Sequence, residues 1–120
     1  MKSQILIIDD EAPIREMLSL YLRKKGFDVA AAMTGQRPVE LLESQRFDLA
    51  ILDVDLNGEN GLDLLKHFKT DYSQMAIVMF SGKLEEDLPA KAMAGGADGF
   101  MRKTDSLHEL FAEVCRHITP

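Results

Sequence analysis

Five short, unbroken apolar runs alternate with amphipathic segments along this chain, and this alternation constrains its fold more than any other feature. The apolar runs occupy residues 5–8, 29–32, 49–52, 75–80 and 99–101. Strands buried on both faces are apolar throughout, whereas half-exposed strands alternate apolar and polar residues. Between the runs, apolar residues recur at helical spacing, as at Ile14, Met17 and Leu18. The pattern predicts an α/β fold with a five-stranded parallel sheet and helices on both of its faces.

Five helices are expected between and after the strands. Their apolar stripes run over residues 14–22, 39–42, 62–68, 84–93 and 107–118. Proline suits the first turn of a helix and glycine its end, which places Pro13 and Gly26 at the two ends of the first helix. Thr34 is a candidate cap for the second helix, and Pro89 leaves the start of the fourth open.

The length and composition fit one domain covering residues 1–120 and restrict what it binds. The chain has 14 Lys and Arg against 20 Asp and Glu, a formal net charge of −6, which disfavours direct nucleic-acid binding. No signal peptide is recognisable and no apolar run is long enough to span a bilayer. The single cysteine excludes a disulfide within the chain and a cysteine-rich metal site, so a cytoplasmic location is expected.

Polar and charged residues stand where the apolar runs end. Asp9 and Asp10 follow the first run, Asp53 the third, Ser81 the fourth, and Lys103 comes after the fifth. The carboxyl ends of parallel strands meet at one edge of a sheet, where ligands bind. Each residue alone also has a structural explanation: the first two aspartates as helix caps, the serine as a turn residue and the lysine as a surface charge.

Taken together, these residue types predict chemistry on a phosphoryl group. Neighbouring carboxylates raise one another's pKa, and a divalent cation relieves that repulsion. Mg²⁺ prefers oxygen ligands and is often held by one or two carboxylates plus phosphate oxygens. A lysine supplies positive charge and a hydroxyl donates a hydrogen bond to a phosphoryl oxygen. The set therefore suits transfer of a phosphoryl group to an aspartate.

Four motifs in order make the chain similar to the receiver domain of bacterial two-component response regulators. The motifs lie at residues 5–11, at 48–53 with Gly61 closing the following loop, at 78–82 and at 96–103. The resemblance covers essentially the whole chain. It implies a flavodoxin-like (βα)5 fold, in which a doubly wound, five-stranded parallel sheet carries helices on both faces. It also implies a phosphorelay signalling module rather than an enzyme.

The resemblance implies that Asp53 accepts a phosphoryl group from a phosphohistidine on a partner. That partner would be a sensor histidine kinase or a histidine phosphotransfer protein. The expected cofactor is Mg²⁺, bound directly by Asp10 and mainly through water by Asp9, with Asp53 and the backbone carbonyl of Asp55 as further ligands.

Three more residues receive roles from the resemblance. Ser81 is expected to hydrogen-bond the phosphoryl group, and Lys103 is expected to pair with it. Phe100 is the expected switch residue, which swings inward when Ser81 moves. Phosphorylation would then change contacts with a downstream protein that the sequence does not identify.

The chain departs from the family pattern at three positions and carries a residue pair of interest beside the acceptor. Phe100 stands at the switch position, where tyrosine is common, so any switch is expected to work by packing without a phenol hydroxyl. Asn57 stands four residues after the acceptor, where proline is frequent, and Thr104 stands where a cis proline commonly follows the lysine, so a trans bond is expected. Asp55 and Lys83 occupy positions that flank the route of the hydrolytic water. We expect an ion pair between them to cover Asp53 partly and to slow aspartyl-phosphate hydrolysis.

Other functions stay open at this point. Residues 53–55 also resemble the Asp-x-Asp motif of haloacid-dehalogenase-type phosphatases, although that motif usually closes the first strand and those enzymes carry additional segments. A receiver-like module that docks partners without phosphorylation is a further possibility. A flavodoxin-like cofactor carrier is disfavoured, because no phosphate-cradling loop follows the first apolar run.

Overall fold

A five-stranded parallel sheet lies at the centre of the structure, with the strand order β2-β1-β3-β6-β7. The strands are β1 (Gln4–Ile8), β2 (Asp28–Ala32), β3 (Leu49–Asp53), β6 (Ala76–Ser81) and β7 (Gly99–Arg102). The structure is a computed structural model and describes residues 2–33 and 36–120, so Thr34 lies outside the described residues. Counted within the sheet, the order is 2-1-3-4-5, which confirms the expected flavodoxin-like arrangement.

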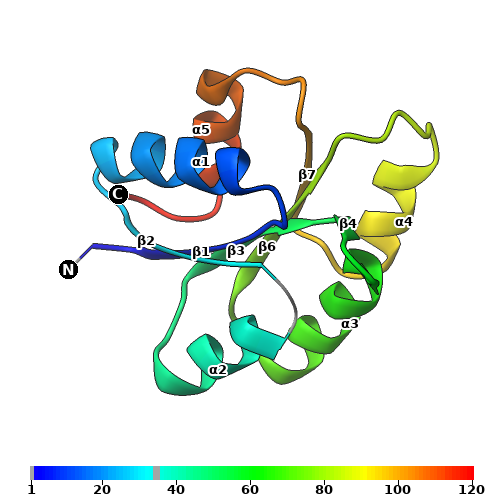
Figure 1. Cartoon of the computed structure of the whole chain (residues 1–120), viewed down its shortest axis with the longest axis horizontal. Coiled ribbons are helices and arrows are strands. Elements are labelled where there is room, and N and C mark those ends of the chain that lie inside the picture. The colour runs from blue at the N-terminus through cyan, green and yellow to red at the C-terminus, as the bar shows by residue number, and fades with distance from the viewer. Residues whose placement is uncertain (1, 34–35) are drawn as a thin grey trace.

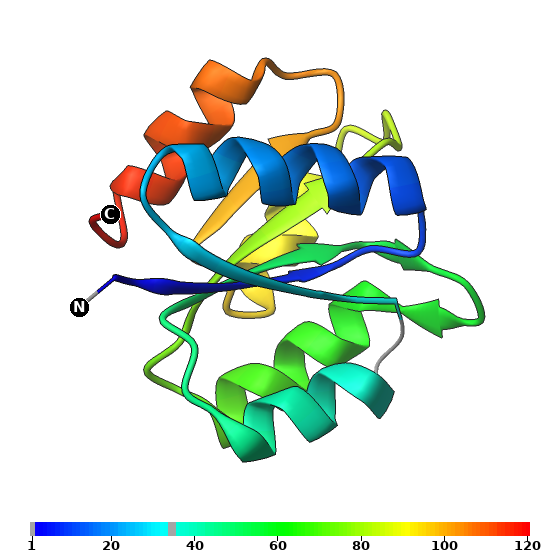
Figure 2. The same cartoon turned by 60° about the vertical axis from the view of Figure 1, so that its left-hand side comes forward.

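Helices cover both faces of this sheet (Figures 1 and 2). On one face lie α1 (Ala12–Lys24) and α5 (Leu107–Cys115), and on the other lie α2 (Gln36–Ser44), α3 (Gly61–Asp71) and α4 (Leu88–Ala94). The doubly wound fold predicted from the alternating pattern is therefore confirmed. No helix within the described ranges combines the length and the apolar character needed to cross a membrane.

The strands are apolar throughout because their side chains enter two separate cores. Ile5 and Ile7 pack with Leu18 and Leu22 of α1 on one face of the sheet. Leu6 and Ile8, which alternate with them, pack on the opposite face. Their partners there come from three helices and include Leu42 of α2, Leu65 and Phe68 of α3, and Leu88 of α4. The strand ends are thus held at fixed positions by packing on both sides.

Local signals set most of the helix ends. Pro13 lies in the first turn of α1, and Gly26 follows its end with a φ of 103°, a left-handed conformation that glycine adopts readily. Helix α5 begins with a capping box, in which the Ser106 hydroxyl accepts the Glu109 backbone N–H and the Glu109 carboxylate accepts the Ser106 N–H.

The structure fixes the start of the fourth helix, which the sequence left open, and the assignment of Leu84 to that helix is wrong. Helix α4 begins at Leu88, and Leu84, which was assigned to its apolar stripe, is 75% exposed. Proline lacks a backbone N–H and clashes with the preceding turn, so it is tolerated only in the first turn of a helix. Pro89 therefore fixes the start of α4 next to itself.

A short antiparallel hairpin between β3 and α3 was not expected from the sequence. Its strands are β4 (Asp55–Leu56) and β5 (Glu59–Asn60), and Leu56 pairs with Glu59 across a turn formed by Asn57 and Gly58. Gly58 has a φ of 79°, which explains the glycine in this turn. The described residues contain no cis peptide bond, so the trans bond predicted before Thr104 is confirmed.

Candidate functional site

The sheet register brings the predicted site residues to one edge. Ile8 lies beside Leu52, so that Asp9 and Asp53, the residues that follow them, are level with each other. On the next strand pairs, Asp53 lies beside Phe80, and Ser81 beside Arg102. Lys103 follows Arg102 directly and donates its backbone N–H to the carbonyl of Ser81 at 2.8 Å. The carboxyl ends of β1, β3, β6 and β7 therefore meet, as the parallel sheet predicts.

The ammonium group of Lys103 lies between two buried carboxylates. Its Nζ is 3.0 Å from Asp9 Oδ2 and 3.0 Å from Asp53 Oδ2, and 3.8 Å from Glu11 Oε2. The Lys103 side chain is 14% exposed, and Asp9 and Asp53 are 1% and 3% exposed. Burial alone would lower the pKa of Lys103, but its contacts with the negatively charged carboxylates of Asp9 and Asp53 raise that pKa above 10.5. The lysine is thus a permanent cation in this site.

Asp53 is poorly solvated, which makes its ionised form costly. Burial raises the pKa of Asp53 from 3.8 to about 6, and the negative charge of Asp9 acts in the same direction. Hydrogen bonds from the backbone N–H of Asp55 and from Lys103 oppose this rise. At neutral pH Asp53 is therefore still ionised, but it is a carboxylate whose charge is incompletely compensated.

Two carboxylate oxygens at this edge are buried and accept no hydrogen bond from the described residues. They are Asp9 Oδ2 and Asp10 Oδ1. Asp9 Oδ2 contacts the Lys103 ammonium at 3.0 Å without hydrogen-bond geometry, whereas Asp9 Oδ1 accepts the Glu11 N–H at 2.8 Å. The residue at the N-cap of α1 is Glu11, without a side-chain cap bond, so Asp9 and Asp10 do not serve as its caps. Of the two, Asp10 Oδ1 has neither a hydrogen bond nor an ion pair among the described residues, and a buried carboxylate oxygen of this kind suits an incoming cation.

A divalent cation fits these residues only if water and other oxygens complete its shell. No group of three acidic, histidine or cysteine side chains among the described residues is placed to hold a metal ion alone. The Asp55 carboxylate is 69% exposed and lies 3.8 Å from Lys83 Nζ, so the predicted Asp55–Lys83 ion pair is present. Mg²⁺ usually keeps several waters and takes only one or two carboxylates. The carboxylates of Asp9, Asp10 and Asp53 are therefore suited to bind a Mg²⁺ ion that keeps part of its water shell.

Ser81 and Phe100 are linked through the loop that follows β6. Ser81 is fully buried, and its Oγ accepts the backbone N–H of Lys83 at 3.0 Å, so its own hydrogen is available for donation. Phe100 is half-buried, with the Arg102 guanidinium carbon 5.5 Å from its ring centre. Arg102 donates from Nη1 to the carbonyl of Lys83 at 2.7 Å. These contacts form a continuous chain from Ser81 through Lys83 and Arg102 to the Phe100 ring.

The structure adds two hydrogen bonds that the sequence did not predict, and it explains the glycine that closes the acceptor loop. The backbone N–H of Asn57 donates to Asp10 Oδ2, and Arg15 Nη1 donates to the Asp9 carbonyl at 2.7 Å. A Cβ atom on Gly61 would overlap the backbone oxygen of Asp53, so only glycine allows the loop to close against the acceptor. The Asn-Gly dipeptide at 57–58 is a hairpin signal that could have revealed the turn carrying the first contact.

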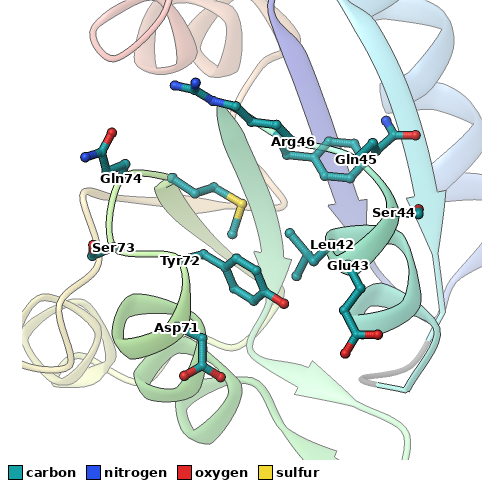
Figure 3. Close-up of a pocket in the computed structure, with 11 residues that line it drawn as sticks. Leu42, Glu43, Ser44, Gln45, Arg46, Asp71, Tyr72, Ser73 and Gln74 are labelled. Atoms are coloured by element: carbon teal, nitrogen blue, oxygen red, sulfur yellow. The ribbon is translucent and has the colours of Figure 1, made fainter.

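A separate cleft of about 520 Å³ lies at the opposite edge of the sheet. It is bounded by the ends of α2 and α3 and by the residues leading into β3 and β6. Leu42 and Tyr72 point into it, and the Glu43 and Asp71 carboxylates lie at its margin (Figure 3). None of the predicted site residues lines this cleft, so the candidate site is the charged edge and not this cavity.

Comparison with known proteins gives a consistent result. A family model described as response regulator receiver domain matches residues 5–115. The chemotaxis protein CheY4 of Vibrio cholerae is 25% identical over 98% of this chain and 100% of that chain, with a TM-score of 0.91. NtrX of Brucella abortus is 27% identical over 98% of this chain and 27% of that chain, with a TM-score of 0.91.

A third structure shows the same fold at lower identity. It is a response regulator protein of Burkholderia pseudomallei with a phosphorylated aspartic acid and a calcium ion. The identity is 21%, over 93% of this chain and 66% of that chain, with a TM-score of 0.86. The family match spans nearly the whole chain, and the order of the strands agrees with it. The chain belongs to the response regulator receiver domain family and is a receiver domain of two-component signalling.

Proposed function

We propose that this receiver domain takes a phosphoryl group from a partner phosphohistidine onto Asp53. The observation that carries the proposal is the pair of 3.0 Å contacts from Lys103 Nζ to the buried carboxylates of Asp53 and Asp9. A buried aspartate can act as the nucleophile, and the cation fixed beside it can neutralise the negative charge of the phosphoryl group that it accepts.

Family membership supports the coarser parts of this proposal. Receiver domains are generally signalling modules rather than catalysts, and histidine kinases are their general partners. Receiver domains also typically bind a divalent metal ion. We propose further that residues 1–120 form one such domain and act in the cytoplasm, and that phosphorylation changes its contacts with a downstream protein.

The transfer itself is a displacement at phosphorus. The ionised Asp53 oxygen forms the new O–P bond, the N–P bond of the phosphohistidine breaks, and its electron pair stays on the imidazole nitrogen. The pKa of about 6 leaves Asp53 ionised at neutral pH, so no base is required to activate it. A bound Mg²⁺ would supply positive charge next to the phosphoryl oxygens. Its ligands would be Asp10, Asp9 through water, Asp53 and the Asp55 carbonyl.

The remaining site residues would respond to the added charge. A phosphoryl group brings about −1.5 to −2 charge to an edge already crowded with acids. Lys103 would turn from the carboxylate of Asp53 to the new phosphoryl oxygens, while the Ser81 hydroxyl would donate a hydrogen bond to one of them. Movement of Ser81 would then alter the loop at Lys83, which Arg102 connects to Phe100. Such a change is a population shift between two arrangements of the face formed by α4, β7 and α5.

Intact-mass measurement after incubation with acetyl phosphate and Mg²⁺ tests the proposal. The wild-type chain should gain one phosphoryl group, and Asp53→Asn and an EDTA-treated sample should gain none. Asp71→Asn, which removes an exposed carboxylate at the far end of α3, is the matched control and should behave like the wild type.

The same experiment separates the two alternatives. If the folded wild-type chain takes up no phosphoryl group, phosphorylation on Asp53 is contradicted and a docking module that works without it is favoured. Steady turnover of p-nitrophenyl phosphate, abolished by Asp53→Asn, would instead favour an aspartyl-nucleophile phosphatase.

A further inference from the structure

We propose that the backbone N–H of Asn57 positions Asp10 for the divalent cation by holding one carboxylate oxygen and leaving the other for the metal. The proposal rests on the function inferred above, because it concerns the same cation. It assigns the hairpin β4–β5 a part in setting the affinity of the site.

The two oxygens of Asp10 are in different environments. Asp10 Oδ2 accepts the N–H of Asn57, a residue 47 positions further along the chain. Asp10 Oδ1 is buried and has no hydrogen-bond partner among the described residues. One oxygen is thus satisfied by the protein, and the other is buried without a hydrogen-bond partner. Hydrogen bonds to the non-ligating atom of a metal ligand fix its orientation and raise metal affinity.

The hairpin is built so that this N–H is both available and fixed. In a two-residue turn closed by the Leu56–Glu59 pair, the N–H of the first turn residue takes no part in the strand pairing. The far end of the hairpin is anchored, since Gly61 donates its N–H to the Val54 carbonyl at 2.8 Å. Val54 follows the acceptor Asp53 directly, so the donor at Asn57 is held by the same loop that begins at the acceptor.

The backbone of Asn57, and not its side chain, makes the contact. Asn57 is an exposed residue, and its main-chain nitrogen is the donor of the hydrogen bond to Asp10. Truncating the side chain should therefore leave the contact intact, whereas removing the N–H should abolish it. Proline removes the N–H, and comparison with alanine accounts for the loss of the asparagine side chain.

The turn geometry allows this substitution. Gly58 has a φ of 79°, as the third residue of a type II turn requires, and proline is favoured as the second residue of such a turn. The residue before a proline prefers extended backbone, and Leu56 lies in β4. Asn57→Pro therefore keeps the turn and deletes the donor, and Asn57→Ala keeps both the turn and the donor.

The test is a titration of the three proteins with MgCl₂, followed by ¹H–¹⁵N NMR. Wild type and Asn57→Ala should bind Mg²⁺ with the same dissociation constant. Asn57→Pro should bind Mg²⁺ about tenfold more weakly, which is the smallest loss of affinity typical when a hydrogen bond to a metal ligand is removed. Equal affinity in all three proteins, or tighter binding by Asn57→Pro, would overturn the inference while leaving the proposed function intact. No binding by the wild type would contradict the cation site itself.

A second measurement keeps the inference testable if Asn57→Pro does not fold. The amide hydrogen of Asn57 in the wild-type protein should be protected from exchange with solvent, and Asp10→Ala should remove that protection. Unchanged protection in Asp10→Ala would show that Asp10 is not the acceptor, and the inference would be wrong.

Discussion

Replacing Asp53 with asparagine is expected to stabilise the metal-free protein at neutral and alkaline pH. Burial raises the pKa of Asp53 from 3.8 to about 6. Since one pKa unit corresponds to about 1.4 kcal/mol, keeping Asp53 ionised lowers the free energy of unfolding by about 3 kcal/mol at pH values well above 6. Asparagine keeps the shape of the side chain and removes the charge, and Lys103 retains its contact with Asp9 at 3.0 Å.

The sign of the pH dependence follows from the direction of the shift. A native carboxyl with a raised pKa binds its proton more tightly than the unfolded chain does, so the wild type gains stability as the pH falls from above 6 towards 4. The advantage of Asp53→Asn should therefore shrink from about 3 kcal/mol near pH 8 to about 1 kcal/mol near pH 4.5.

Urea unfolding followed by circular dichroism in EDTA measures this difference, with Asp71→Asn as the exposed control. The control should differ from the wild type by less than about 0.5 kcal/mol at both pH values. Added Mg²⁺ should stabilise the wild type and narrow its gap to Asp53→Asn, because a ligand that binds only the folded state shifts the equilibrium towards it. An Asp53→Asn protein no more stable than the wild type near pH 8 would refute the reasoning.

Two further outcomes test the surroundings of the acceptor. Lys83→Ala should shorten the lifetime of the aspartyl phosphate, because it removes the ion pair with Asp55 at 3.8 Å. The control Lys91→Ala, which removes the exposed ion pair with Asp87 on α4, should leave the lifetime unchanged. Equal lifetimes in all three proteins would reject the role of the Asp55–Lys83 pair. Gly61→Ala should lower the free energy of unfolding by about 2 kcal/mol or more, because its Cβ would meet the Asp53 carbonyl oxygen. A Gly61→Ala protein as stable as the wild type in thermal unfolding would show that the loop can yield there.

The fold and the residues that form the site could be predicted from the sequence for a physical reason. Strands buried on both faces must be apolar throughout, so the runs at 5–8 and 49–52 identified strands of a covered parallel sheet. The carboxyl ends of such strands must converge, so the sequence alone assigns Asp9, Asp53 and Lys103 to one edge of the sheet.

The local geometry of the site was not accessible in the same way. That Lys103 bridges Asp9 and Asp53, and that the two oxygens of Asp10 differ, depends on side-chain positions that strand periodicity does not specify. The hairpin was missed although Asn57 and Gly58 form a recognised turn pair, because its strands are only two residues long and carry no periodic signal.

Identification of the phosphorylated residue tests the central claim most directly. After incubation with acetyl phosphate and Mg²⁺, reduction with borohydride converts an acyl phosphate on aspartate to homoserine, which tandem mass spectrometry locates in the sequence. We predict homoserine at position 53 and nowhere else. Homoserine at position 9, 10 or 55, or none in a protein that remains folded, would contradict the assignment of Asp53 as the acceptor.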